Sequence, residues 1–506
     1  MRVSISSEVA PSIREFERTS TAIANVYVQT HVERYLRELD ARLRRLDYKG
    51  NLFMMLSSGG IATLETAVAF PIRLLESGPA AGALAAASYG MACGRTDLVS
   101  FDMGGTTAKF CVISGGQPLI AQEFEFDRVY RFKKGSGLPA KIPVIELAEI
   151  GAGGGSIARV DRLGLLKVGP DSSGADPGPV CYGRGGTEPT VTDADLVLGY
   201  LDPSFFLGGR MKLDLEGARR ATQDHIGCKL GKSWEQAAWG IHQVVNENMA
   251  IAARAHVLER GHDPSRLPLF AFGGAGPVHA FRIARALGSP ELIAPLGAGI
   301  MSTVGFLTAP TAFDFVRPWR VELSRVDWQR AQSLLRVMEA EGERILVASG
   351  IEAANIYTVS AVDMRYVGQG HEIQVPLPSG AINEQTVPAL AKTFEERYRQ
   401  LYGRSGPPVP LEIMNWRVEV SGPKPSAQLR LREKPSRGNV IKGTRPAYFP
   451  EAAGFVDTPV YDRYQMTQDY RFEGPAIVEE RESTLVVGPG APCHIDDQWN
   501  LIVRMS

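Results

Sequence analysis

The spacing of apolar residues over the first hundred positions predicts alternating helices and strands. Between residues 20 and 48, apolar side chains recur near helical spacing among arginines and glutamates, which predicts a long amphipathic helix. A short apolar run at 52–56 predicts a buried strand. Residues 63–90 predict two helices, broken around Pro71 and again at 77–79. This alternation indicates an α/β layer.

The pattern changes to that of strands between residues 97 and 123. Three apolar runs, DLVSF, AKFCVI and PLIAQEF, are separated by the turns MGGTT and SGGQ, which predicts a meander of three short strands. The section that follows, from IGAGGGS to TVTDADLV, is dense in glycine and proline. We therefore expect ordered loops there rather than long helices.

A second stretch of helix and strand closes the first part of the chain. Residues 234–260 predict a long helix, and Ser233 with Gln236 three positions later forms a capping-box pattern at its start. The strand LPLFAF, the turn GGAGP and a helix that begins near Val278 then form a strand–turn–helix unit, and ELIAP with GAGIMSTVGF repeats it. We assign residues 1–310 to one α/β core.

The remaining residues predict two further regions. In 311–423, strands near VRPWRVEL, IYTVSAVDMRYVG and HEIQVPLP are combined with helices near 328–349 and over VPALAKTFEERYRQLYG, which is typical of an α+β region. In 424–506, proline and glycine separate short strands, which predicts a C-terminal β-rich module.

Composition and charge narrow the classes of function. The 506 residues are 44% hydrophobic and 22% charged, so we expect two or more ordered domains. The net charge of −1 favours small-molecule substrates over nucleic acid or a membrane surface. The five cysteines form no CxxC pair, and no long apolar run or signal peptide is present, which predicts a cytoplasmic protein.

The most specific local motif is FDMGGTTAK, at the turn between two predicted strands. Gly104 and Gly105 allow the backbone N–H groups to approach phosphate oxygens, and the hydroxyls of Thr106 and Thr107 add donors. Asp102, at the end of the first strand, is placed to hold Mg²⁺. The spacing differs from that of a Walker loop, and the alternative is an ordinary Gly-Gly hairpin turn.

A second glycine turn, FGGAGPVHA, leads from a strand into a helix. Such a turn offers free N–H groups at the positive end of a helix and leaves room for a nucleotide. The alternative is a tight structural connection. The expected cofactor-binding residues of this turn and of the first motif are Gly104, Gly105, Lys109, Gly273, Gly274, Ala275 and Gly276.

A third glycine cluster, GAGGGS, is not a dinucleotide fingerprint, because a strand hairpin rather than a helix is predicted after it. It is a candidate for lining a phosphate or substrate cleft. The nearby carboxylates Glu146, Glu149 and Asp176 are candidates for metal or general-base roles, with turn stabilisation as the alternative for Asp176. Cys111, in the second strand of the hairpin, is predicted to be a core residue.

These motifs, taken in order, resemble the hydantoinase A and 5-oxoprolinase family over nearly the whole chain. The segments that carry the resemblance are SSEVAPSIREFERTSTAIANVYV, LLESGPAAG, FDMGGTTAK, IGAGGGSIA, GADPGPVCYGRGGTEPTVTDADLVLG, ERGHDP, FGGAGPVHA and DMRYVGQGHEI. The family includes ATP-dependent hydrolases of N-methylhydantoin and 5-oxoproline, and subunits of acetone and acetophenone carboxylases.

The resemblance implies an actin-like (ribonuclease H-like) ATPase core, with FDMGGTTAK as the second phosphate hairpin and FGGAGPVHA as the loop on the nucleoside side. It implies ATP and Mg²⁺ as cofactors, with Asp102, Thr106 and Thr107 as catalytic residues. Family chains carry a first Asp-Gly-Gly-Thr hairpin further upstream, and none precedes FDMGGTTAK here, so we expect an N-terminally incomplete core or a separate polypeptide that supplies the missing half-domain.

The implied activity is phosphorylation of the carbonyl oxygen of a cyclic amide of the hydantoin or 5-oxoproline type, followed by hydrolysis. The implied partner is a hydantoinase B-type subunit, in a hetero-oligomer. Two alternatives stay open: an ATP-dependent ketone carboxylase subunit, and a nucleotide-binding partner without turnover of its own.

Overall fold

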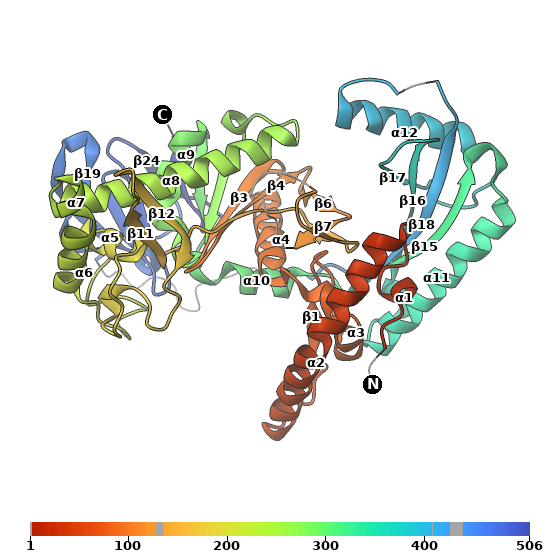
Figure 1. Ribbon diagram of the computed structural model, residues 1–506, viewed down its shortest axis with the longest axis horizontal. Helices are drawn as coiled ribbons and strands as arrows, with labels where there is room; N and C mark the ends of the chain where they lie inside the picture. Colours follow the sequence, from red (N-terminus) through yellow and green to blue (C-terminus); the bar gives the residue numbers. More distant parts are fainter. Residues whose placement is uncertain (1–2, 127–134, 407, 426–438, 506) are drawn as a thin grey trace. The chain divides into compact units, whose positions relative to one another are not determined.

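The computed structural model describes residues 3–126, 135–406, 408–425 and 439–505 (Figure 1). They form a mixed α/β fold that divides into two compact units. Unit 1 comprises Met1–Ala80, Ile120–Ile145 and Phe306–Ser426, and unit 2 comprises Ala81–Leu119, Glu146–Gly305 and Ala427–Ser506. Each unit therefore draws on more than one of the three sequential regions 1–310, 311–423 and 424–506.

Unit 2 is built on a nine-stranded sheet in the order β10-β4-β3-β13-β14-β25-β24-β21, with β5 paired to β4. Its centre is parallel, because β13 pairs in parallel with both β3 and β14, whereas β3 and β4 form an antiparallel hairpin. The first two strands of the predicted meander are confirmed as β3 and β4. The predicted third strand, PLIAQEF, is wrong as one strand, because only Gln117–Pro118 (β5) pairs with β4 and Ile120–Ala121 pairs with a different strand, Val144–Ile145. The strands of this sheet are β3 (Leu98–Met103), β4 (Ala108–Ser114), β5 (Gln117–Pro118), β10 (Ala148–Ile150), β13 (Leu269–Phe272), β14 (Glu291–Ala294), β21 (Arg471–Glu473), β24 (Pro492–Ile495) and β25 (Leu501–Arg504).

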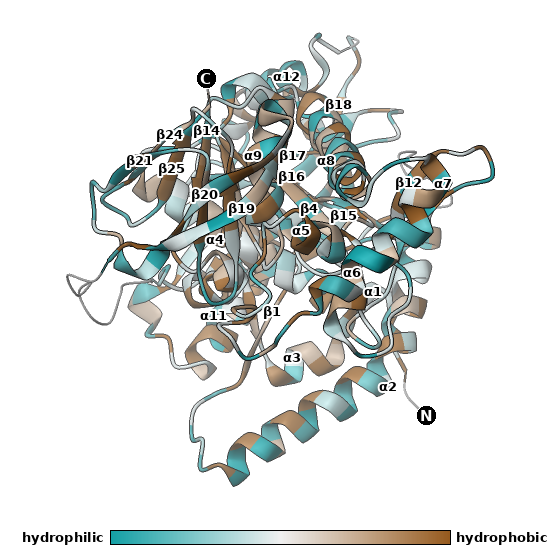
Figure 2. Ribbon diagram, turned by 90° about the vertical axis from the view of Figure 1, so that its left-hand side faces the viewer, coloured by the Kyte–Doolittle hydropathy of each residue, from teal (hydrophilic) through white to brown (hydrophobic). Residues whose placement is uncertain are grey.

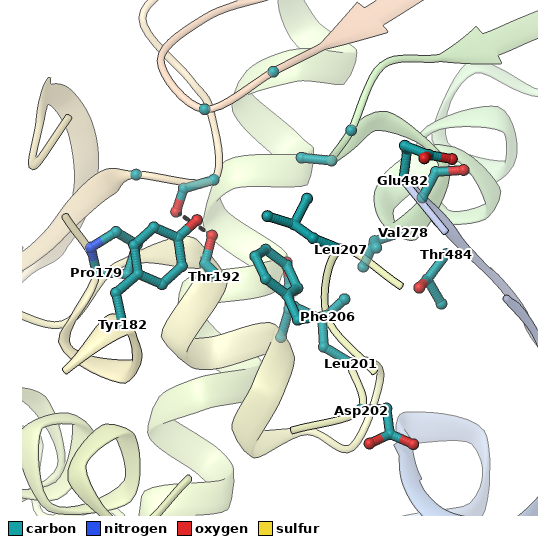
Figure 3. A pocket seen from close by; sticks show the side chains of 18 of the residues that line it. Pro179, Tyr182, Thr192, Leu201, Asp202, Phe206, Leu207, Val278, Glu482 and Thr484 are labelled. Carbon is teal, nitrogen blue, oxygen red and sulfur yellow. Dashed lines mark hydrogen bonds between the residues drawn. The ribbon is translucent and has the colours of Figure 1, made fainter. Parts of the chain in front are cut away.

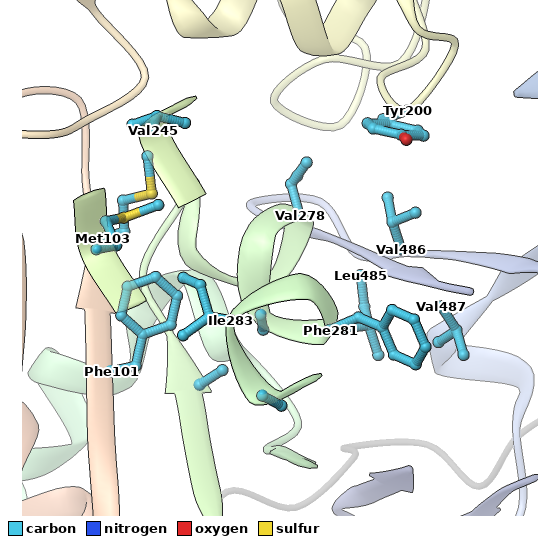
Figure 4. Close-up of a cluster of buried hydrophobic side chains, with 14 of the residues drawn as sticks. Phe101, Met103, Tyr200, Val245, Val278, Phe281, Ile283, Leu485, Val486 and Val487 are labelled. Atoms are coloured by element: carbon cyan, nitrogen blue, oxygen red, sulfur yellow. The ribbon is translucent and has the colours of Figure 1, made fainter. Parts of the chain in front are cut away.

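Helices of unit 2 pack on this sheet around a large apolar core. Figure 4 shows α9 with Phe101 and Met103 of the β3 side next to it, and Leu485 and Val487 of β23 on its other side. At the start of α8 the predicted capping box is present, since Ser233 and Gln236 each accept a hydrogen bond from the other's backbone N–H. The helices are α5 (Val191–Val197), α6 (Leu215–Thr222), α7 (Cys228–Leu230), α8 (Trp234–Glu259) and α9 (Gly276–Leu287), with α4 (Ser77–Ala92) and α10 (Met301–Thr308) at the unit boundary.

Two smaller sheets complete unit 2. The hairpin of β11 (Ser156–Val160) and β12 (Leu166–Ser172) follows the third glycine cluster directly, as predicted. The second sheet has the order β19-β20-β22-β23. Its strands are β19 (Ile441–Phe449), β20 (Gly454–Asp462), β22 (Ala476–Glu479) and β23 (Thr484–Val487).

Unit 1 has its own four-stranded antiparallel sheet, in the order β15-β18-β16-β17, with a core around the fully buried Trp416 and Phe394. Its larger elements are α2 (Glu15–Arg45), β15 (Ala312–Glu322), α11 (Trp328–Ala348), β16 (Tyr357–Tyr366), β17 (Ile373–Pro376), α12 (Thr386–Tyr402) and β18 (Leu411–Ser421). The shorter ones are α1 (Ser6–Val9), β1 (Phe53–Met55), β2 (Ile61–Thr63), α3 (Leu64–Ala69), β6 (Ile120–Ala121), β7 (Phe124–Phe126), β8 (Leu138–Ala140) and β9 (Val144–Ile145).

The long helix α2 is present, but the face that it buries is not the expected apolar one. Figure 2 shows hydrophilic and hydrophobic residues mixed along it, and Ile23 and Tyr27 are exposed. The buried side is largely polar because Asn25 and Gln29 donate hydrogen bonds to backbone carbonyls of α3, among them that of Ala69. Apolar spacing therefore predicted the helix and misassigned its inner face. Among the residues that the structure describes, no helix combines the length and apolarity that crossing a membrane requires.

Candidate functional site

The two predicted nucleotide turns emerge at the same edge of the unit 2 sheet. β3 and β13 are parallel neighbours, and Asp102 at the end of β3 lies in register with Phe272 at the end of β13. Carboxyl ends of parallel strands meet at one edge, so the turns that follow them are adjacent. A direct bond links them, because the N–H of Ala275 donates to the carbonyl of Met103 over 3.0 Å.

The third glycine cluster packs against the first turn. The N–H of Gly154 donates to the carbonyl of Gly104 over 3.0 Å, and the N–H of Gly155 donates to that of Gly105 over 2.7 Å. A side chain has no room in this contact, since a Cβ on Gly153 would lie 2.5 Å from the nitrogen of Thr106. The GAGGGS cluster, which does not fit a dinucleotide fingerprint, therefore supports the FDMGGTTAK turn through backbone hydrogen bonds. We call it the brace of this turn.

Gly153→Ala is expected to separate these two loops. The added methyl group must displace backbone atoms, which we expect to destabilise the fold by about 1–3 kcal/mol and to weaken nucleotide binding. Denaturant unfolding and ATP titration measure the two effects. Gly443→Ala is the matched control, because a Cβ there meets nothing within 4 Å. Equal behaviour of the two variants would contradict the bracing role.

A cavity of about 310 Å³ opens beside the three glycine loops. In Figure 3, Phe206 and Leu207 lie in the middle of the view, with Tyr182 and Thr192 on one side and Val278 and Glu482 on the other. The cavity therefore combines backbone amides with an apolar wall, as small-molecule sites do. The lining residues are Gly104, Gly105, Thr106, Gly154, Gly155, Gly174, Ala175, Pro179, Tyr182, Thr192, Asp195, Leu201, Asp202, Phe205, Phe206, Leu207, Gly274, Ala275, Val278 and Glu479 to Thr484.

Half of the sequence-predicted site residues line this cavity. Gly104, Gly105, Thr106, Gly274 and Ala275 are among the lining residues. The other five belong to the same two motifs but are not among the lining residues. They are Asp102, Thr107, Lys109, Gly273 and Gly276. Gly104 and Gly105 face open space, since a Cβ on either would meet no atom within 4 Å, so an anionic ligand can approach their backbone.

The two charged residues of the first motif differ in their partners: Asp102 is largely buried, whereas Lys109 is paired with a carboxylate. Burial raises the pKa of Asp102, and the charge of Lys109 and a hydrogen bond from Ser302 offset only part of that shift. A carboxylate whose ionised form is disfavoured in this way is stabilised by a nearby cation, so Asp102 fits a role in holding Mg²⁺. Lys109 is already engaged, because its Nζ lies 2.9 Å from Glu149 and donates to Thr107 Oγ1 over 2.6 Å.

The carboxylates Glu146, Glu149 and Asp176, singled out in the sequence, are not among the residues that line the cavity. Glu146 pairs with Arg260 and Glu149 pairs with Lys109. Asp176 is exposed in the loop next to the lining residues Gly174 and Ala175. Cys111 is fully buried, which confirms its assignment to the core.

Sequence reasoning missed contributions from two distant parts of the chain. Residues 479–484 bring the C-terminal module to the cavity, where Glu480 accepts hydrogen bonds from the N–H groups of Gly297 and Ala298. Asp195, on α5, meets two buried histidines from α8 and α9. No local pattern marks these residues, because their partners lie tens or hundreds of positions away.

The sequence matches a known protein family over most of its length. A family described as "Hydantoinase/oxoprolinase" matches residues 18–314, and its C-terminal domain matches residues 327–504. An uncharacterized protein of Methanocaldococcus jannaschii is 36% identical over 97% of this chain and 71% of its own length.

Two relatives with named activities are similarly close. The caprolactamase subunit alpha of Pseudomonas jessenii and the acetophenone carboxylase gamma subunit of Aromatoleum aromaticum are both 33% identical, over 97% and 98% of this chain and 70% and 68% of theirs. The crystal structure of the ATP-dependent caprolactamase from Pseudomonas jessenii superposes with a TM-score of 0.81 at 31% identity, over 99% of this chain and 72% of that one. This similarity shows the mixed α/β fold over nearly the whole chain.

Proposed function

Because the chain belongs to the hydantoinase/oxoprolinase family, we propose that it is an ATP-dependent hydrolase subunit that opens a cyclic amide of the hydantoin or 5-oxoproline type. One observation carries the proposal. The FDMGGTTAK turn, the GAGGGS brace and the GGAGP turn all line one cavity, and this cavity also has an apolar wall. The backbone amides suit phosphates, and the apolar wall suits a nucleoside base or the ring of a lactam.

The proposed core is actin-like, with the β3–β4 hairpin holding the phosphates of ATP. The N–H of Gly105 and the hydroxyl of Thr106 donate to the phosphate oxygens, where charge develops during transfer. Gly104 closes the turn beside them, because its N–H donates to the carbonyl of Thr107 over 3.2 Å. Asp102 and Thr107 orient this hairpin and its cation, and the turn from Gly273 to Gly276 supports the nucleoside side. Mg²⁺, when bound, neutralises phosphate charge.

The proposed reaction has three steps. The carbonyl oxygen of the cyclic amide attacks the γ-phosphorus and ADP leaves, so the carbonyl carbon then carries a phosphate group. Water adds to that carbon and the C–N bond breaks towards the nitrogen, which takes up a proton and leaves an acyl phosphate. A second water cleaves the acyl phosphate to a carboxylate and inorganic phosphate, so that a lactam yields a free amine and a hydantoin yields a ureido group. Phosphorylation is needed because an amide carbonyl is otherwise a poor electrophile.

A second candidate is an ATP-dependent ketone carboxylase subunit, and the 33% identity to an acetophenone carboxylase subunit favours it. In that case the phosphoryl group would be transferred to an enol or to bicarbonate. A third is a nucleotide-binding partner without turnover. The substrate that stimulates ADP release separates these three candidates.

The proposed partner is a hydantoinase B-type subunit, in a cytoplasmic hetero-oligomer. Its support is that the relatives with named activities are designated as subunits. The chain spans 68–71% of the length of the three relatives.

The test is calorimetric titration of Mg·ATP into the purified chain, followed by assays of ADP release with a B-type subunit added. We expect saturable binding, and ADP release that depends on caprolactam, hydantoin or 5-oxoproline and is accompanied by the ring-opened acid. Release stimulated only by a ketone with bicarbonate would support the carboxylase instead. A folded chain that binds no nucleotide, with or without the added subunit, would contradict the enzyme proposal.

A further inference from the structure

A cluster of three buried ligand-type side chains lies in the wall of the cavity. Asp195 of α5, His242 of α8 and His279 of α9 are 2%, 1% and 0% exposed, and one ligand atom from each lies within 4.8 Å of the other two. His242 Nδ1 is 2.8 Å from Asp195 Oδ1, and His279 Nε2 is 3.2 Å from Asp195 Oδ2. Three helices therefore converge on one carboxylate, and that carboxylate belongs to a cavity-lining residue.

The ring of His279 lies between two oxygen atoms. Its Nδ1 is 2.9 Å from Asn246 Oδ1, and its Nε2 is 3.2 Å from Asp195 Oδ2. A ring that donates from Nδ1 to Asn246 would have the lone pair of Nε2 free for a metal ion. A cation held between Nε2 and the carboxylate would be attracted to both.

We propose that Asp195, His242 and His279 bind a divalent transition-metal ion of the zinc type, a site additional to the Mg·ATP site at Asp102. Two imidazoles and one carboxylate form the ligand set of many hydrolytic zinc sites, in which a further position stays open. Asp195 is one of the residues that line the cavity, so the open position would lie on the cavity side. Nitrogen ligands favour zinc, iron or cobalt over magnesium, which prefers oxygen.

The surroundings of the cluster match those of a metal site. Metal-ligating histidines usually donate their second ring N–H to an oxygen acceptor, and Asn246 Oδ1 lies 2.9 Å from His279 Nδ1, where such an acceptor is needed. In the bound form, His242 would bind through Nδ1 and carry its proton on Nε2.

The test is metal binding by the full chain, which needs no assay of turnover. After dialysis against a chelator, the protein is titrated with Co²⁺ and followed by visible absorption, and Zn²⁺ content is measured by mass spectrometry. We expect one ion per chain, a d–d spectrum of a four- or five-coordinate nitrogen and oxygen site, and displacement of Co²⁺ by Zn²⁺. Wild-type protein without a stoichiometric site would overturn the proposal, and would identify the cluster as a metal-free hydrogen-bond network.

Substitutions then test whether the bound ion is held by Asp195, His242 and His279. His242→Gln and His279→Gln are expected to abolish stoichiometric binding. Asn246→Ala, which keeps all three ligands, should weaken affinity about 10–100-fold, and it serves where a ligand variant fails to fold. The matched control is His256→Gln, since His256 is another buried histidine of α8 that lies outside the cluster. Binding that survives both ligand variants, or that is unchanged in Asn246→Ala, would also overturn the proposal.

Discussion

Asp102→Asn is expected to weaken Mg·ATP binding at least about a hundredfold, or about 2.7 kcal/mol, and to leave the fold at least as stable as the wild type. Asparagine keeps the shape of the side chain but cannot carry the negative charge that attracts the cation. Stability should not fall because burial raises the pKa of Asp102, which means that the folded state disfavours the ionised form. Calorimetry measures binding and thermal unfolding measures stability.

The stability difference between Asp102→Asn and the wild type should depend on pH in a defined direction. Any gain in stability from Asp102→Asn should be full at neutral pH and should shrink as the pH falls, because protonated Asp102 no longer carries a desolvated charge. Asp97→Asn is the matched control. The backbone N–H of Gly115 lowers the pKa of Asp97, so its loss should reduce stability above that pKa and leave ATP binding unchanged. Undiminished Mg·ATP binding by Asp102→Asn would contradict the assignment of the cation site.

The parts of the fold that local chemistry determines could be predicted from the sequence. The Ser233 and Gln236 capping box, the β3–β4 hairpin and the strand–turn–helix around Gly273 all depend on residues within a few positions of one another. The sequence also predicted part of the candidate site. Gly104 and Gly274 line one cavity, as expected for two turns of one nucleotide site. Their adjacency depends on the parallel pairing of β3 with β13, which no local motif specifies.

The remaining features depend on contacts between distant segments. Glu480 enters the cavity wall through hydrogen bonds to Gly297 and Ala298, about 180 positions earlier in the chain. Asp195 and His242 are 47 residues apart and come together only because α5 packs on α8. On α2, apolar spacing gave the wrong inner face, because polar side chains such as Asn25 satisfy buried backbone groups there. Polar side chains that bond buried backbone groups in this way do not follow a helical repeat, so the sequence pattern does not reveal them.

Gly273→Ala is expected to damage both the fold and the nucleotide site. Gly273 has a φ of 89°, and a Cβ on it would lie 2.4 Å from Asp102 Oδ1 and 2.4 Å from the carbonyl oxygen of Met103. Left-handed backbone costs an alanine about 1–2 kcal/mol, and forced overlap adds about 1–3 kcal/mol. We therefore expect a loss of about 2–5 kcal/mol in unfolding free energy, and at least a tenfold loss of ATP affinity, because Asp102 must move.

The neighbouring glycine supplies the control for this effect. Gly274→Ala introduces the same methyl group into the same turn, but its Cβ would meet only the carbonyl oxygen of Glu482 at 3.7 Å, an ordinary contact. Gly274 has no positive φ, so alanine can adopt its backbone conformation. We expect stability near that of the wild type for Gly274→Ala, measured by denaturant unfolding beside Gly273→Ala. Equal stability of the two variants would show that Asp102 is not held in place by the close approach of the β13 turn, since only Gly273 makes that approach.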